Sequence, residues 1–182
     1  MPELIVITGG PGAGKTALLR ELEARGYACA DEVAREIIRE QVELKGDVLP
    51  WADRELFARL MLERSLRQWR ELQATQTMVF VDRGLPDTLC YARLVGLSED
   101  FARQAYEVCM SFRYSRTVFI APAWEEIYVT DAERRQDFDE AIATFGLMVR
   151  TYKDCGYQLV ELPKASVRER AEFVLRYLAA TP

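Results

Sequence analysis

The sequence predicts an α/β fold of three layers, in which helices cover both faces of a five-stranded parallel sheet. Apolar, strand-like segments alternate with amphipathic helical patterns along the 182 residues, as in strand–helix–strand units. Two of the strand segments, 77–82 and 117–121, are continuous apolar runs, which suit strands covered on both faces. We expect residues 1–182 to form a single domain, since this length is enough for one full core.

The predicted elements follow one another in regular order. We expect strands at 3–8, 27–31, 77–82, 117–121 and 157–162. We expect helices at 15–25, 32–45, 52–75, 86–95, 99–112, 132–154 and 167–179. Gly26 and Gly156 follow two of these helices as C-caps. Two other helix starts fit capping boxes, at Thr130 to Glu133 and at Ser166 to Glu169.

The first strand leads directly into residues 9–16, which have the pattern G-x-x-x-x-G-K-T. A strand, this loop and a helix in that order identify a phosphate-binding P-loop. Glycines let backbone N–H groups turn inward around the phosphates, and the helix N-terminus adds partial positive charge. We expect Lys15 to reach the β- and γ-phosphates of ATP and the Thr16 hydroxyl to ligate Mg²⁺. The expected nucleotide contacts are Gly10, Pro11, Gly12, Ala13, Gly14, Lys15, Thr16 and Ala17.

Composition excludes several other functions. A net charge of −5 argues against a broad nucleic-acid surface. The chain has no histidine, so acid–base chemistry falls to carboxylates. The four cysteines form no C-x-x-C pair and suit reduced core thiols. Because neither a signal peptide nor an apolar stretch of membrane length is visible, we expect a cytoplasmic protein with no membrane partner.

Two charged residues follow the third predicted strand. Active sites of open parallel sheets gather at the carboxyl ends of the strands, and Asp82 lies at such an end. We expect Asp82 to hold Mg²⁺ with Thr16; the alternative is a turn or helix N-cap aspartate. The pair Asp82-Arg83 is similar to the D-R motif of nucleoside and nucleotide kinases, in which the arginine reaches toward a phosphate. A salt bridge at the sheet edge is the alternative for Arg83.

The second predicted strand ends at Asp31 and Glu32. Nucleoside kinases commonly place the base for the acceptor hydroxyl at this position, and Glu32 is the first candidate for it, followed by Asp31. The alternative is that both are acids of a helix start, where the helix dipole favours them.

Three further segments are candidates for substrate contacts. Residues 122–140 are a candidate lid, in which Arg134 and Arg135 would neutralise the transferring phosphoryl group; a solvated, capped helix start is the alternative. Residues 33–75 form a long helical insertion that would build the acceptor pocket. The loop 162–167 is expected to pack against the base, and Trp51, in a loop, is a weaker stacking candidate.

Four segments together resemble a known group, the P-loop domain shared by the bacterial nicotinamide riboside kinase/regulator and the eukaryotic TRPL-translocation-defect protein, an AAA-type predicted ATPase. The matching segments are residues 9–16, Glu32-x-x-Arg35-Glu36, Asp82-Arg83-Gly84 and Asp131-x-x-Arg134-Arg135-Gln136-Asp137-Phe138. They span nearly the whole chain, and the P-loop is the most specific of them. The resemblance implies a nucleoside- or nucleotide-kinase-like P-loop NTPase that binds ATP, and it leaves the substrate open.

Three functions remain compatible with the sequence. The first is a kinase that moves the γ-phosphate of MgATP to a small nucleoside-like or other hydroxyl or phosphate acceptor. The second is an ATPase or nucleotide-dependent switch that acts with a protein partner. The third is a nucleotide-binding module with little catalysis. A homodimer is compatible with each of them.

Overall fold

The computed structural model describes residues 3–127 and 138–180. Its strands form one parallel sheet in the order β2-β3-β1-β4-β5. The bounds of each strand agree with a predicted segment to within two residues, so the predicted α/β class with a five-stranded parallel sheet is confirmed. The strands are β1 (Leu4–Gly9), β2 (Ala28–Ala30), β3 (Val79–Asp82), β4 (Thr117–Ala121) and β5 (Gln158–Glu161).

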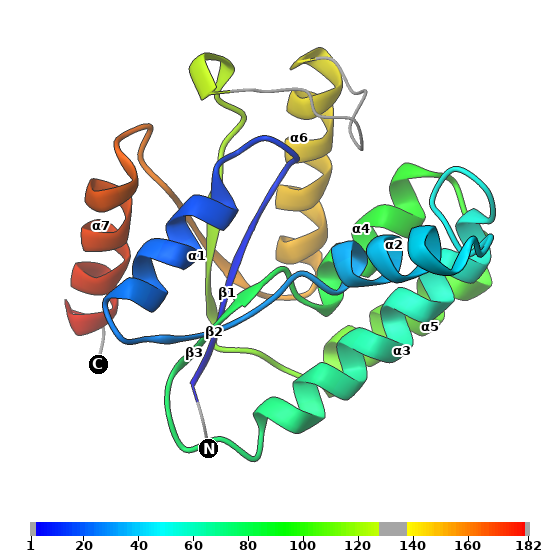
Figure 1. Ribbon diagram of the computed structural model, residues 1–182, viewed down its shortest axis with the longest axis horizontal. Coiled ribbons are helices and arrows are strands. Elements are labelled where there is room, and N and C mark those ends of the chain that lie inside the picture. Colours follow the sequence, from blue (N-terminus) through cyan, green and yellow to red (C-terminus); the bar gives the residue numbers. More distant parts are fainter. Residues whose placement is uncertain (1–2, 128–137, 181–182) are drawn as a thin grey trace.

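Seven α-helices are described, and their order agrees with the predicted one. They are α1 (Lys15–Ala24), α2 (Val33–Leu44), α3 (Arg54–Leu72), α4 (Leu85–Leu94), α5 (Glu99–Ser111), α6 (Phe138–Asp154) and α7 (Val167–Ala180), with a short 3₁₀ helix η1 (Glu125–Ile127) after β4. Helices α1 and α7 lie on one side of the sheet, and α3, α4, α5 and α6 lie on the other (Figure 1). The predicted sixth helix begins at 132, and its first residues and its capping box fall outside the described residues.

The central strand, β1, buries side chains on both of its faces, which explains its continuous apolar sequence. Leu4 and Val6 pack with α3, α4 and α5 in one core cluster. Ile5 and Ile7, on the opposite face, pack with α1 and α7 in a second cluster. Strand residues alternate between faces, so one apolar run supplies both cores.

Helix ends follow the predicted signals. The Ser166 backbone N–H donates to Glu169 Oε2 at 3.0 Å, and the Glu169 N–H donates back to Ser166 Oγ at 3.3 Å, which is the expected capping box. Gly26 and Gly156 have φ of +92° and +78°, in the region that favours glycine at a helix end.

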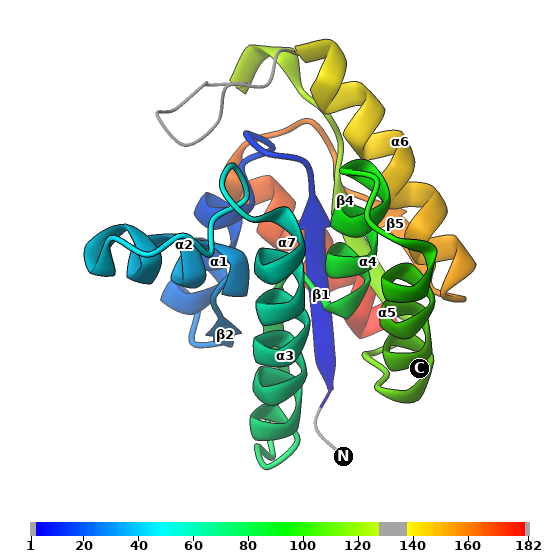
Figure 2. The ribbon, with the colours of Figure 1, turned by 90° about the vertical axis from the view of Figure 1, so that its right-hand side faces the viewer.

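The segment 33–75 forms α2, which extends away from the sheet, a loop, and α3, which runs alongside β1 (Figure 2). A separate apolar cluster of Val33, Ile37, Phe57 and Met61 joins the two helices. The Arg64 guanidinium on α3 also pairs with Glu40 on α2. This packing places the amino end of α2 beside the carboxyl end of the sheet. Within the described ranges, no helix has the length and hydropathy that a membrane span requires.

Candidate active site

The loop between β1 and α1 follows a path that depends on glycine. Gly9 has φ of +144°, and a Cβ added there would lie 2.7 Å from the Ala121 carbonyl oxygen. Gly12 and Gly14 have φ of +71° and +73°. Three glycines at positive φ within six residues turn the backbone around a small space at the carboxyl end of the central strand.

The ammonium group of Lys15 lies against the start of this loop. The side chain is 4% exposed. Its Nζ donates to the carbonyl oxygens of Gly9 at 2.9 Å and Gly10 at 3.2 Å. The cation is therefore held at the loop, where a P-loop lysine meets phosphate.

A second cation holds the other end of the loop. Arg170 on α7 is 3% exposed, and its two terminal nitrogens donate to the carbonyl oxygens of Ala13 and Gly14, each at 3.2 Å. Arg170 was not among the predicted site residues, because only the fold brings α7 beside a loop more than 150 residues earlier.

Asp82 ends β3 beside Thr16. The Asp82 side chain is 6% exposed, and its Oδ1 has no hydrogen-bond partner among the described residues. Burial raises the pKa of this carboxyl group. Asp82 and Thr16 line the same polar cavity, of about 260 Å³. A buried carboxylate oxygen without a donor, facing a cavity with a hydroxyl group, fits a Mg²⁺ site.

Arg83 follows with a left-handed backbone, at φ +68°. Its Nε lies 2.9 Å from Glu32 Oε1, and its Nη1 lies 3.0 Å from Asp87 Oδ1. Burial opposes the charge, and these carboxylates outweigh it, so the pKa of Arg83 is held above its ordinary value. A Cβ added at the next residue, Gly84, would lie 3.0 Å from the Tyr114 ring, which is a tight contact. The Asp-Arg-Gly motif therefore turns the chain sharply and directs a cation between two acids.

The two sequence candidates at the end of β2 differ in environment. Glu32 is 8% exposed, whereas Asp31 is exposed. The Glu32 side chain makes no capping hydrogen bond to α2. It pairs with Arg83 and, through Oε2, with Arg35 Nε at 3.0 Å. The structure thus brings Glu32 and Arg83 together, which short-range sequence patterns do not show.

Asp87 is the second residue that the sequence analysis missed. Asp87 Oδ1 accepts one hydrogen bond from Arg83 Nη1 and another from Thr8 Oγ1, the latter at 2.7 Å. Oδ2 accepts from the Gly84 N–H at 2.8 Å and from the Tyr152 hydroxyl. An acid three residues after Gly84, with a proline between, signals a helix start. That signal explains the contact with Gly84 and gives no indication of the contacts with β1 and α6.

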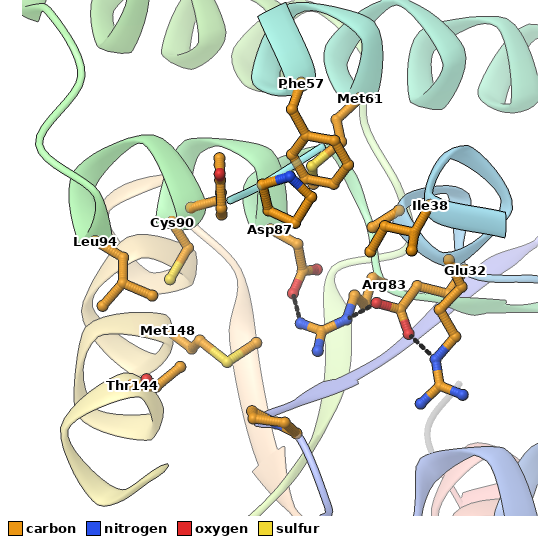
Figure 3. A pocket seen from close by; sticks show the side chains of 15 residues that line it. Glu32, Ile38, Phe57, Met61, Arg83, Asp87, Cys90, Leu94, Thr144 and Met148 are labelled. Atoms are coloured by element: carbon orange, nitrogen blue, oxygen red, sulfur yellow. Dashed lines mark hydrogen bonds and ion pairs between the residues drawn. The ribbon is translucent and has the colours of Figure 1, made fainter. Parts of the chain in front are cut away.

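These groups form one side of a cavity of about 270 Å³ (Figure 3). Glu32, Arg83 and Asp87 lie in a row along that side, and Phe57, Met61, Leu94 and Met148 are among the apolar side chains around the rest (Figure 3). The remaining lining residues are Pro11, Ala34, Arg35, Ile38, Pro50, Cys90, Tyr91 and Thr144. The cavity therefore reaches from the P-loop into the space between α2, α3, α4 and α6.

The charges that line this cavity cancel. Glu32 and Asp87 are acids, Arg35 and Arg83 are bases, and the ion pairs above join them. The Tyr91 hydroxyl also lines the cavity. Burial raises the pKa of Tyr91 to about 12. The Tyr91 oxygen has no hydrogen-bond partner among the described residues. The cavity suits a ligand with no net charge that offers an apolar part and hydroxyl groups.

The remaining sequence candidates are not among the described residues that line this cavity. Arg134 and Arg135 lie outside the described residues, as does most of the candidate lid 122–140. Trp51 is 59% exposed and is not among the residues that line the cavity.

The fold and the loop define a P-loop nucleotide-binding protein with a parallel sheet. The sequence matches the AAA domain family over residues 4–170, and the chain belongs to that family. Among curated proteins, none matches the sequence significantly.

Several solved structures share the fold. A NadR protein in complex with NR is 19% identical, with a TM-score of 0.74 over 99% of this chain and 52% of the other. A deoxyadenosine kinase from M. mycoides is 15% identical, with a TM-score of 0.66 over 97% and 99% of the two chains. Shikimate kinase from Acinetobacter baumannii in complex with shikimate is 17% identical, with a TM-score of 0.60 over 99% and 94%.

The present chain thus spans about half the length of NadR and nearly the full length of the two kinases. The likeness to NadR and the family match agree with the resemblance expected from the sequence. Similarity at these identities shows a shared fold, and the function depends on the site that the fold carries.

Asp87→Asn is expected to lower the free energy of unfolding by about 3–5 kcal/mol, because it removes the buried carboxylate of the pair and leaves the partly buried Arg83 charge with one partner fewer. The matched control is Asp154→Asn, which breaks the Asp154–Arg93 pair at 2.8 Å on a side chain that is 52% exposed. We expect the control to cost less than about 1 kcal/mol. Urea unfolding measures both, and similar small losses would contradict the structural role given to Asp87.

Proposed function

We propose that this protein is a kinase that transfers the γ-phosphate of MgATP to a hydroxyl group of a small, uncharged, nucleoside-like acceptor. One observation carries the proposal: a single cavity is lined both by Pro11 of the P-loop and by Glu32, the expected base. Phosphate donor and acceptor would therefore meet at the carboxyl end of the sheet, as in other open parallel sheets.

The acceptor class follows from the cavity lining. A phosphorylated acceptor needs cations that are not already neutralised, and both lining arginines pair with carboxylates. An apolar wall and the Tyr91 hydroxyl suit a ring that carries hydroxyl groups. Two of the solved structures with this fold are named as kinases, for deoxyadenosine and for shikimate, and this supports the reaction type.

The nucleotide would lie over residues 10–17. The backbone N–H groups and Lys15 would bind its phosphates. Thr16 and Asp82 would hold Mg²⁺, which supplies positive charge to the phosphate oxygens when bound. Arg134 and Arg135 remain the candidates for a lid. A homodimer and a cytoplasmic location also stay predictions.

Transfer requires that one bond form as another breaks. The acceptor oxygen would bond to the γ-phosphorus while the bond from that phosphorus to the bridging oxygen of ADP breaks. A Glu32 carboxylate oxygen would take the proton of the acceptor hydroxyl. Arg83 holds Glu32 in place from one side and Arg35 from the other, so the base would be positioned before the acceptor binds.

ADP release with and without acceptors tests this function. The probes are nucleosides and cyclic polyols, each compared with its monophosphate, with Lys15→Ala as the inactive control. We expect uncharged hydroxyl compounds to stimulate ADP release and their monophosphates to give no stimulation. Release that no acceptor changes would favour the alternative, an ATPase that acts with a protein partner.

Glu32→Gln is expected to lower acceptor phosphorylation by about 10²–10⁴-fold, because the amide cannot take the proton. Affinity for ATP should change little. Glu40→Gln is the matched control, since Glu40 also pairs with an arginine, Arg64, and does not line the cavity. Turnover and melting temperature are measured on the same preparations. A Glu32→Gln protein that melts lower and turns over normally would make Glu32 a structural acid.

Asp82→Asn is expected to abolish the gain in ATP affinity that magnesium gives, because the amide is a weaker Mg²⁺ ligand than the carboxylate. Calorimetric titration with ATP in magnesium and in chelator measures this gain. Asp154→Asn, far from the P-loop in sequence and partly exposed, should retain it. An unchanged magnesium dependence in Asp82→Asn would leave Asp82 with a structural role only.

A further inference from the structure

The position of the acceptor cavity limits where the base of the nucleotide can lie. The cavity lies on the side of the P-loop that α2, α3, α4 and α6 cover. In transfer, the γ-phosphate lies between the acceptor and the rest of the nucleotide. The nucleoside must therefore leave the loop on the opposite side, toward α1 and α7 (Figure 1).

On that opposite side lies a buried cation that the phosphate chemistry above does not use. Arg170 is 3% exposed and donates to the carbonyl oxygens of Ala13 and Gly14. Its Nε has no hydrogen-bond partner among the described residues, and no carboxylate of residues 3–127 or 138–180 pairs with it. Burial alone lowers its pKa. A buried guanidinium without a carboxylate partner destabilises the folded protein unless a ligand or an aromatic ring compensates its charge.

Trp124 supplies such a ring. It lies three residues beyond the end of β4, in the segment that leads to η1 above the carboxyl end of the sheet (Figure 1). The guanidinium carbon of Arg170 lies 5.9 Å from the centre of the Trp124 ring. The indole is only partly buried. Arg170 thus joins the ring on one side to the carbonyl groups of the P-loop on the other.

We propose that Trp124 is the platform on which the base of the nucleotide stacks, with Arg170 fixing the ring relative to the P-loop. The inference rests on the nucleotide site of the proposed function and adds a binding residue to it. A tryptophan ring has two faces; Arg170 lies at one of them, and the base would take the other. Aromatic stacking accepts any base, so Trp124 would strengthen binding of ATP and GTP alike.

Calorimetric titration with MgATP, MgGTP and magnesium tripolyphosphate tests the stacking role, because tripolyphosphate has no base. Trp124→Ala is expected to weaken both nucleotides by about 5- to 100-fold and to leave tripolyphosphate within about 2-fold of wild type. Trp124→Phe, which keeps a ring, should recover most of the loss. The matched control is Trp51→Ala, which removes an exposed indole that is not itself a lining residue of the cavity and should bind all three ligands normally.

The possible outcomes distinguish failure of the stacking role of Trp124 from failure of the proposed kinase function. Equal losses for the nucleotides and for tripolyphosphate in Trp124→Ala would make Trp124 a support of the P-loop and would overturn the stacking role alone. Nucleotide binding at wild-type strength in Trp124→Ala would overturn it as well. A wild-type protein that binds neither ATP nor tripolyphosphate would overturn the nucleotide site, and the proposed function with it.

Discussion

The pairing of one partly buried arginine with two buried carboxylates organises this site. Arg83 lies between Glu32, at the start of α2, and Asp87, in the first turn of α4. Asp87 in turn accepts hydrogen bonds from Thr8 on β1 and Tyr152 on α6. Because a buried charge without a partner is strongly destabilising, these elements must assemble together. The same pairs fix the position of the expected base and remove net charge from the cavity.

The P-loop depends on a comparable arrangement of cations. Lys15 holds the carbonyl groups at its start, and Arg170 holds those at its end. Helix α7 is therefore coupled to the loop, although it lies far along the chain. The cavity is lined by Pro11 near the start of the loop, whereas Arg170 contacts Ala13 and Gly14 at its end. The two proposals together place acceptor, phosphates and base in that order along the loop.

Local patterns were sufficient for most of the fold. Strands with apolar runs such as 77–82, and helix ends such as Ser166 to Glu169, are specified by neighbouring residues, so the sequence predicts them well. The P-loop is specified in the same way by residues 9–16. Position at a strand end also predicted Asp82, Arg83 and Glu32 as candidates, although their roles remain predictions.

Long-range contacts explain what the sequence analysis missed. Thr8 and Asp87 are 79 residues apart, and Ala13 and Arg170 are 157 apart. Their pairing depends on the order β2-β3-β1-β4-β5, which no local pattern encodes. Trp124 was missed for the same reason, since only the fold brings its ring beside Arg170. Asp87 fits a helix-start signal, and that local signal gives no indication of its contacts with Thr8 and Tyr152.

The central claim is that the γ-phosphate passes from ATP to a hydroxyl group that lies beside Glu32. Phosphorus NMR of the wild-type protein with MgATP and a stimulating acceptor tests this most directly, because it identifies the product. We predict a new phosphate monoester resonance that grows in equal amount with ADP, with little inorganic phosphate. Inorganic phosphate in equal amount with ADP, and no monoester, would contradict the claim.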